Sequence, residues 1–276
     1  MVPGFYPGIP GPVYHANEAV SASRLKLLRE SGRHCKAAMD GKLKPTSDAL
    51  IFGHRFHAVT LEPDLFQKTY IPVPEGMKLN LKEGKDWKAA QTKEAIPWSD
   101  WKDMLGMAEA LNEHPIAGPY LRAKGRNELS AWSKHERTGL DLRCRFDRLL
   151  DCHLAIDLKS TVCARPWKWI RDAAKLGYHI QSAFYQDMLA RLGEKCEGFI
   201  FLAVEKTIPY NVLCCELDAA SINKGRSEYE RLLDLYKQYK DANYWPGYSD
   251  ECEILTLPDW SLREEAFESA TPYLLN

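Results

Sequence analysis

The amino-acid sequence predicts an α/β (α+β) fold, in which a sheet is flanked by helices and preceded by a helical section. Two observations support this prediction. Before residue 120 the apolar residues recur with a period near 3.6, as in Ser99–Glu113, which is typical of amphipathic helices. Beyond residue 120 the period changes to 2, most strictly in Leu140–Asp147, which is typical of strands. Strands that alternate with helical segments indicate a sheet covered by helices.

Two more helices are expected in the first part of the chain. Ser21–Glu30 begins with a serine N-cap and is expected to end at Gly32, and Ala49–Leu61 is expected to stop at Pro63. Residues 71–98 combine little periodicity with many charges, which indicates a long surface segment, a partly helical flap.

Five strands and three helices are expected in the second part of the chain. The short connection at Asp151–Cys152 should join two of the strands as a hairpin. The expected strands are 128–133, 140–147, 154–159, 198–205 and 210–216, and the expected helices are 166–176, 178–192 and 219–241. We expect a single domain over 1–276, with an extended arm at 1–13, a helical part at 14–120, a core at 121–240 and an acidic tail at 241–276.

The net charge of −1 hides an uneven distribution. Residues 121–175 hold thirteen Lys/Arg and seven Asp/Glu, a balance of +6, whereas residues 241–276 hold one Arg and eight Asp/Glu, a balance of −7. A basic surface favours a phosphate backbone as partner, and an ordinary mixed-charge surface is the alternative.

The cysteines and the hydropathy pattern restrict the class of protein. The eight cysteines form no CxxC pair, so we expect reduced thiols, no zinc or iron–sulfur site and a cytoplasmic location. The chain has no run of 18 apolar residues, so no membrane-spanning helix is expected.

Three polar side chains on the predicted hairpin suggest chemistry. Asp157 and Lys159 are two residues apart and should share one face of their strand, and hairpin pairing would bring Asp147 beside them. Carboxylates bind Mg²⁺, the metal activates water, and a lysine can orient or deprotonate that water. Glu128, which opens the preceding strand, could supply another carboxylate. The arrangement suits phosphodiester hydrolysis; a surface ion pair between Asp157 and Lys159 is the alternative.

Several motifs occur in a characteristic order along the chain. They are Val20–Leu25, Gly53–Pro63, Glu128, Arg143–Asp147, Ile156–Lys159 and a helix that carries Tyr178, Gln181 and Tyr185. Together they resemble the exonuclease VIII (RecE) family of phage and prophage recombination nucleases, within the PD-(D/E)XK superfamily that includes phage lambda exonuclease. The resemblance covers residues 14–205 and implies a PD-(D/E)XK nuclease core with a central mixed sheet.

The resemblance also implies the roles of individual residues. Its metal ligands fall on the side chains of His57, Asp147 and Asp157 and on the backbone carbonyl of Leu158, with His54 as the rival histidine on the same helix. The catalytic lysine falls on Lys159, and further active-site residues fall on Glu128, Gln181 and Tyr185. The implied cofactor is Mg²⁺, for which Mn²⁺ would substitute, without an iron–sulfur cluster.

The activity implied by the family is 5′→3′ exonuclease digestion of linear double-stranded DNA. It would leave 3′ single strands for an annealing protein of the RecT type, and the enzyme would be a ring-shaped homo-oligomer, a trimer or a tetramer. Three alternatives stay open. They are a restriction-type enzyme, a CRISPR-associated iron–sulfur nuclease, whose C-terminal cysteine triplet this chain lacks, and a catalytically inactive DNA-binding relative.

Two segments are candidates for DNA contacts. The first mixes basic and aromatic residues after the Lys159 strand, and its alternative interpretation is a packed helix with buried tryptophans; it comprises Arg165, Trp167, Lys168, Trp169 and Arg171. The second is the helix start with Ser23 and Arg24, where phage lambda exonuclease has a similar stretch that helps to bind a 5′-phosphate. The alternative is that Ser21 and Ser23 only cap the helix.

Overall fold

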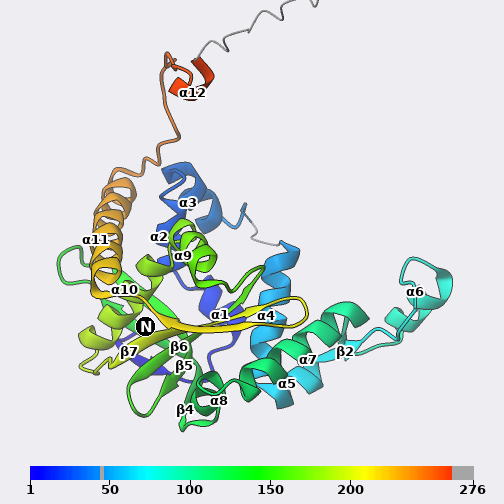
Figure 1. The fold of residues 1–276 in the computed structure, drawn as a ribbon. Helices are drawn as coiled ribbons and strands as arrows, with labels where there is room; N and C mark the ends of the chain where they lie inside the picture. The colour runs from blue at the N-terminus through cyan, green and yellow to red at the C-terminus, as the bar shows by residue number, and fades with distance from the viewer. Residues whose placement is uncertain (44–46, 263–276) are drawn as a thin grey trace, which may run out of the picture.

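The computed structural model describes residues 1–43 and 47–262, and a six-stranded mixed sheet runs through its body (Figure 1). The strand order is β1-β4-β5-β6-β7-β8, with β6 and β7 parallel and all other neighbours antiparallel. The bounds are Gly4–Tyr6 (β1), Gly125–Lys134 (β4), Asp141–Leu150 (β5), Leu154–Thr161 (β6), Gly198–Glu205 (β7) and Val212–Glu216 (β8). The predicted central mixed sheet is therefore confirmed.

One face of the sheet is covered by four helices: α2 (Ala22–Leu27), α9 (Pro166–Lys175), α10 (Tyr178–Arg191) and α11 (Ala219–Ala242). The apolar residues of the alternating strand, such as Leu142 and Phe146, lie fully buried in this layer, as the period of 2 predicts. Helices α10 and α11 pack closely at Gly225, where a Cβ atom would lie 2.1 Å from the carbonyl oxygen of His179.

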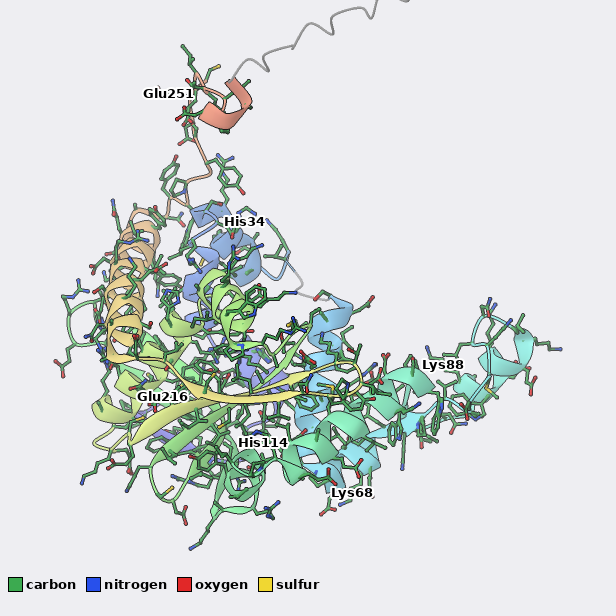
Figure 2. The ribbon with its side chains drawn as sticks, in the orientation of Figure 1. His34, Lys68, Lys88, His114, Glu216 and Glu251 are labelled. Carbon is green, nitrogen blue, oxygen red and sulfur yellow. The ribbon has the colours of Figure 1, made fainter. Side chains whose placement is uncertain are left out.

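The other face is covered by α4 (Asp48–Leu61), α5 (Pro63–Thr69), α7 (Trp98–Glu113) and α8 (Ala117–Arg122). Ile156 and Leu158 of β6 are buried in this layer, and Ala155 is buried in the opposite one. Strand β6 is therefore enclosed on both faces, and Figure 2 shows the side chains that fill the space around the sheet.

Several local expectations need correction. Gly32 does not end the first helix: α2 ends at Leu27, and Gly32 is the first residue of α3 (Gly32–Met39), which Ser31 caps by accepting the N–H of His34. Pro63 does stop α4, but it also begins α5, because proline is tolerated in a first helical turn.

The segment 1–13 is more ordered than an extended arm. Residues 4–6 form β1, which pairs antiparallel with β4, and Gly11 begins the short helix α1 (Gly11–Ala16). The flap is confirmed as partly helical: β2 (Tyr70–Pro72) and β3 (Glu94–Ile96) pair in parallel and carry α6 (Lys82–Ala89) away from the sheet (Figure 1).

The C-terminal segment leaves the body after α11. Residues 251–259 are exposed, and α12 (Asp259–Leu262) is the last described element. The rest of the predicted acidic tail, 263–276, lies outside the described residues. Within the described ranges, no helix combines the length and the apolar character needed to cross a bilayer.

Candidate active site

The candidate site lies where strands β5 and β6 separate. The two strands pair only at Arg148–Ile156 and Leu149–Ala155, next to the turn that joins them. Beyond this point the carboxylate of Asp147 spans the gap, because its Oδ2 accepts the backbone N–H of Leu158 at 2.8 Å. A side chain of β5 thus supplies the acceptor that a backbone carbonyl of β5 would supply if the two strands were still paired.

Helix α4 brings His57 to the same gap. Its Nε2 lies 3.0 Å from the carbonyl oxygen of Leu158, and its Nδ1 lies 3.6 Å from Oδ1 of Asp147. Two ligand atoms at about 2.1 Å from one cation and at right angles lie roughly 3 Å apart. The spacing of the His57 nitrogen and the Leu158 oxygen therefore suits ligation of one ion as well as a direct hydrogen bond.

Glu128 lies beside His57 and Asp147, and these three side chains form the candidate metal cluster. The ligand atoms of these three residues all lie within 4.8 Å of one another. Glu128 has a φ of 47°, in the left-handed region, although Asn127 and Leu129 on either side of it pair regularly with β5. One imidazole and two carboxylates form a donor set that suits Mg²⁺ or Mn²⁺.

Asp157 and Lys159 lie on the sheet face that α10 covers. Asp157 is only 2% exposed; its Oδ1 accepts a hydrogen bond from Nε2 of Gln181 at 2.7 Å, and its Oδ2 forms an ion pair with Lys159. The predicted adjacency of Asp157, Lys159 and Gln181 is therefore present. The expectation that Asp147 shares their face needs revision, since Asp147 reaches across the strand gap instead.

The ammonium group of Lys159 lies over two aromatic rings. Its Nζ lies 5.0 Å from the ring centroid of Tyr178 and 6.0 Å from that of Phe201, and the buried Trp169 packs against both rings. These rings offer their negative faces to the ammonium group, which holds the lysine in a largely water-free place.

The electrostatics of the site reflect its burial. Burial alone would lower the pKa of Lys159, but Asp157 and Asp147 outweigh it and the pKa is raised, so the lysine stays charged. Burial, with a contribution from Asp147, raises the pKa of Asp157 despite the lysine beside it. Burial and the neighbouring Asp147 also raise the pKa of Glu128 to about 8. A divalent cation would relieve this crowding of carboxylates.

A cavity of about 380 Å³ opens at the strand gap. Besides His57, Glu128 and Asp147, two predicted residues line it: Tyr185 of α10 and Ser23 of α2. The other lining residues, most of which no sequence motif marks as site residues, are Gly11, Tyr14, His15, His54, Ala58, Glu62 and Arg145. The sequence does indicate a place in the site for Arg145, since it lies two residues before Asp147 on an alternating strand and should share its face.

The two serines at the start of α2 have different surroundings. Ser21 is buried and caps the helix by accepting the N–H of Arg24 at 3.3 Å, whereas Ser23 is exposed and lines the cavity. Their hydroxyl groups lie 2.9 Å apart. The guanidinium group of Arg24 donates to the backbone carbonyls of Glu18 and Ala19.

The basic and aromatic strip lies on α9 and at its N-cap. Trp169 is buried in the core, as the alternative interpretation expected, but Trp167 is 60% exposed. Lys168 is half-buried, and Arg165 and Arg171 are exposed. The outer face of α9 therefore keeps its positive charge toward solvent.

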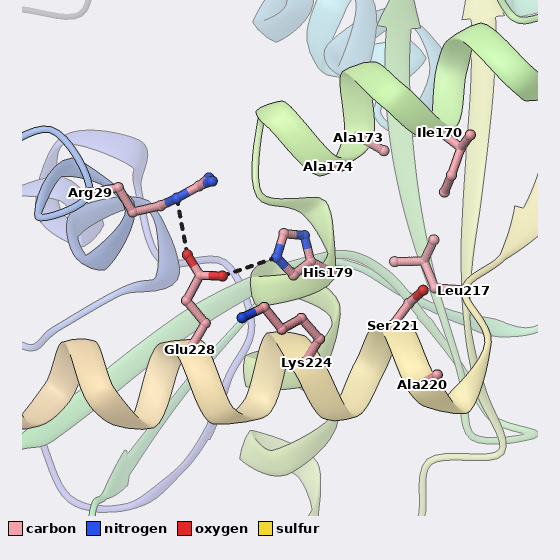
Figure 3. A pocket seen from close by; sticks show the side chains of 10 residues that line it. All are labelled: Arg29, Ile170, Ala173, Ala174, His179, Leu217, Ala220, Ser221, Lys224 and Glu228. Carbon is pink, nitrogen blue, oxygen red and sulfur yellow. Dashed lines mark hydrogen bonds and ion pairs between the residues drawn. The ribbon is translucent and has the colours of Figure 1, made fainter. Parts of the chain in front are cut away.

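A second cavity, of about 510 Å³, lies between α9 and α11 (Figure 3). Glu228 bridges Arg29 at 3.1 Å and His179 at 3.4 Å in its wall, and much of the remaining lining is apolar. It contains none of the predicted site residues.

A mixed sheet with carboxylates at the separation of two antiparallel strands defines the class, a nuclease fold of the PD-(D/E)XK type. The chain belongs to the family described as PDDEXK-like domain of unknown function (DUF3799), which matches residues 21–258. The family and the fold support a DNA nuclease. No curated protein matches the chain.

The solved structures that match this chain include the following two. A candidate exonuclease from Eubacterium rectale aligns with a TM-score of 0.67 at 16% identity, over 91% of this chain and 95% of its own. A phage related exonuclease from Haemophilus somnus 129PT aligns with a TM-score of 0.34 at 15% identity, over 82% of this chain and 96% of its own. The first likeness supports the fold; membership of the RecE family in particular stays a prediction.

Proposed function

We propose that this protein is a Mg²⁺-dependent deoxyribonuclease, and that it digests linear double-stranded DNA from 5′ to 3′. The observation that carries the nuclease proposal is the convergence of His57, Glu128 and Asp147 at the strand gap, beside the buried Asp157–Lys159 pair. Oxygen-rich donor sets of this kind bind hard divalent cations.

The ligands we propose are His57, Asp147, Asp157 and the carbonyl of Leu158, with Glu128 as an additional carboxylate. A bound Mg²⁺ would polarise the scissile phosphate and acidify a water molecule. The chain's own groups would do the rest. Lys159, held charged beside Asp157, would donate to a phosphate oxygen or to the attacking water. Gln181 would hold Asp157 in place, and Tyr185 would contact the DNA strand.

Three finer parts of the proposal rest on the family resemblance. They are the 5′→3′ direction, a ring-shaped trimer or tetramer that encloses DNA, and the delivery of 3′ single strands to a RecT-type annealing protein in the cytoplasm of a bacterial host. The competing function is a restriction-type nuclease on the same fold. It would cut closed circular DNA, which an exonuclease that needs an end leaves intact.

The test uses linear duplex labelled at its 5′ or 3′ ends and closed circular duplex as the control. With Mg²⁺ we expect early release of the 5′ label, no attack on circles, and no reaction in EDTA. Lys159→Ala should abolish cleavage while a gel-shift assay still shows DNA binding. Activity of Lys159→Ala within about threefold of wild type would refute the catalytic assignment.

A further inference from the structure

The N-terminal segment 4–16 is built into the wall of the candidate site. Strand β1 adds an edge strand to β4, with Phe5 opposite Ala131. Behind it, Tyr14 packs edge-on against the buried Trp132, with a ring separation of 5.8 Å. The DUF3799 match begins at residue 21, so this segment lies outside the part of the chain that defines the family.

Tyr14 connects this segment to two arginines of β5. The guanidinium carbon of Arg143 lies 4.5 Å from the centroid of the Tyr14 ring, and that of Arg145 lies 4.2 Å from it. Tyr14 is only 7% exposed, so these cation–π contacts are formed away from water, where they are strongest.

Arg145 connects Tyr14 to Glu128 of the candidate metal cluster. Its Nη2 donates to the carbonyl of Ile9 at 2.7 Å, its Nε donates to Ser130 at 2.9 Å, and its Nη1 lies 3.8 Å from Oε2 of Glu128. The guanidinium group is thus held on one side by segment 4–16 and faces Glu128 on the other. Loss of the segment would release the positive charge that restrains this carboxylate.

His15 adds a group that faces the substrate side. It lines the same cavity as His57 and Asp147, its side chain is exposed, and its neighbour Tyr14 is anchored by the arginines. An imidazole N–H at this position can donate to a phosphate oxygen of DNA in the cavity.

We propose that segment 4–16 is a working part of the active site, in which Tyr14 positions Glu128 through Arg145 and His15 contacts a DNA phosphate. This inference rests on the proposed nuclease function. It assigns the segment to substrate and metal handling rather than to folding alone.

The experiment compares four single variants of the full chain. Tyr14→Leu removes the ring between the arginines and should raise the Mn²⁺ concentration needed for half-maximal activity, and lower kcat, by about tenfold or more. Tyr14→Phe keeps the ring and loses a hydroxyl that forms no hydrogen bond within the described chain. This variant should therefore stay close to wild type in kcat and in its Mn²⁺ requirement. His15→Ala should raise KM for DNA about fivefold without changing the Mn²⁺ requirement. The matched control is Val13→Ala, on the same helix but 56% exposed and outside the cavity.

Calorimetric Mn²⁺ binding gives a readout that does not depend on cleavage. Weaker binding by Tyr14→Leu than by Tyr14→Phe supports the inference even if the wild-type protein cleaves no DNA, in which case only the proposed function fails. Wild-type Mn²⁺ affinity in Tyr14→Leu, or a wild-type KM in His15→Ala, overturns it. His15 is exposed, so its variant tests the inference even if Tyr14→Leu does not fold.

Discussion

The backbone N–H of Leu158 donates to Oδ2 of Asp147 at 2.8 Å and joins β6 to β5 where their regular pairing has ended. Asp147 therefore has two tasks, one as a structural acceptor on the edge of a strand and one as a proposed metal ligand. A substitution that keeps the acceptor and removes the charge separates the two.

We expect Asp147→Asn to keep the fold and to lose divalent-metal binding, because the amide oxygen can still accept from Leu158 but is a poorer ligand for a hard cation. Asp157→Asn should also lose metal affinity. Isothermal calorimetry with Mg²⁺ and Mn²⁺ measures both, and Asp151→Asn, in the exposed hairpin turn, is the control. Unchanged affinity in both variants would refute the ligand roles.

Metal binding should depend on pH through Glu128. Burial and the neighbouring Asp147 raise its pKa to about 8, so the metal-free fold keeps a proton that the unfolded chain releases. This contribution to stability is fully present below the unfolded pKa of about 4.3 and is lost as the pH rises through about 8. A cation must displace the proton, so the Mg²⁺-induced rise in Tm should be larger at about pH 8.5 than at about pH 6. Glu128→Gln should remove the difference; an equal rise at both pH values in wild type would contradict this.

Ser21 and Ser23 form a matched pair for end recognition. Ser21→Ala removes a helix cap worth about 1 kcal/mol and should lower Tm by a few degrees. Ser23→Ala should leave Tm nearly unchanged and reduce the preference for 5′-phosphorylated over 5′-hydroxyl ends, because Ser23 lines the cavity. The measurements are thermal melts and digestion of both kinds of duplex. If Ser23→Ala lowers Tm and leaves the end preference intact, the serine is structural.

The outer face of α9 offers a test of the DNA path. Reversing the charges of Lys168 and Arg171 should raise KM for DNA and flatten the dependence of binding on salt, since fewer counterions are released from the phosphates. Titrations of DNA binding at several salt concentrations measure the slope. Lys240→Glu, on the exposed end of α11, is the control. A slope equal to that of wild type would place the DNA elsewhere.

The period of the apolar residues was enough to predict the main sheet and its covering helices. Leu142 and Phe146 alternate in the sequence and lie in one core layer, and the hairpin with its short turn is present. The Asp157–Lys159 pair followed from their spacing of two residues. These features are local, and local patterns report them.

The features that sequence reasoning missed are not local. The pairing of Phe5 with Ala131 and the stacking of Tyr14 on Arg145 join residues more than 120 positions apart, and nothing in a Pro- and Gly-rich segment announces them. The sequence predicts Gly32 as a helix end, but the structure needs glycine there for another reason. A Cβ atom at this position would lie 2.8 Å from Cδ of Pro246, which is too close. Asp147 does not share the face of Asp157, because Phe146 of β5 lies in the same core layer as Ala155 of β6 and not in that of Ile156. Alternation within one strand does not reveal this relation between two strands.

The backbone of Glu128 has a consequence for protein engineering. A side chain in the left-handed region costs about 1 kcal/mol relative to glycine, and this residue occupies that region in the middle of a strand. A search for thermostable variants would therefore favour glycine at position 128, and each such gain would delete a carboxylate from the cavity. Selection for heat resistance should therefore favour glycine at position 128, whereas selection for catalysis should favour glutamate.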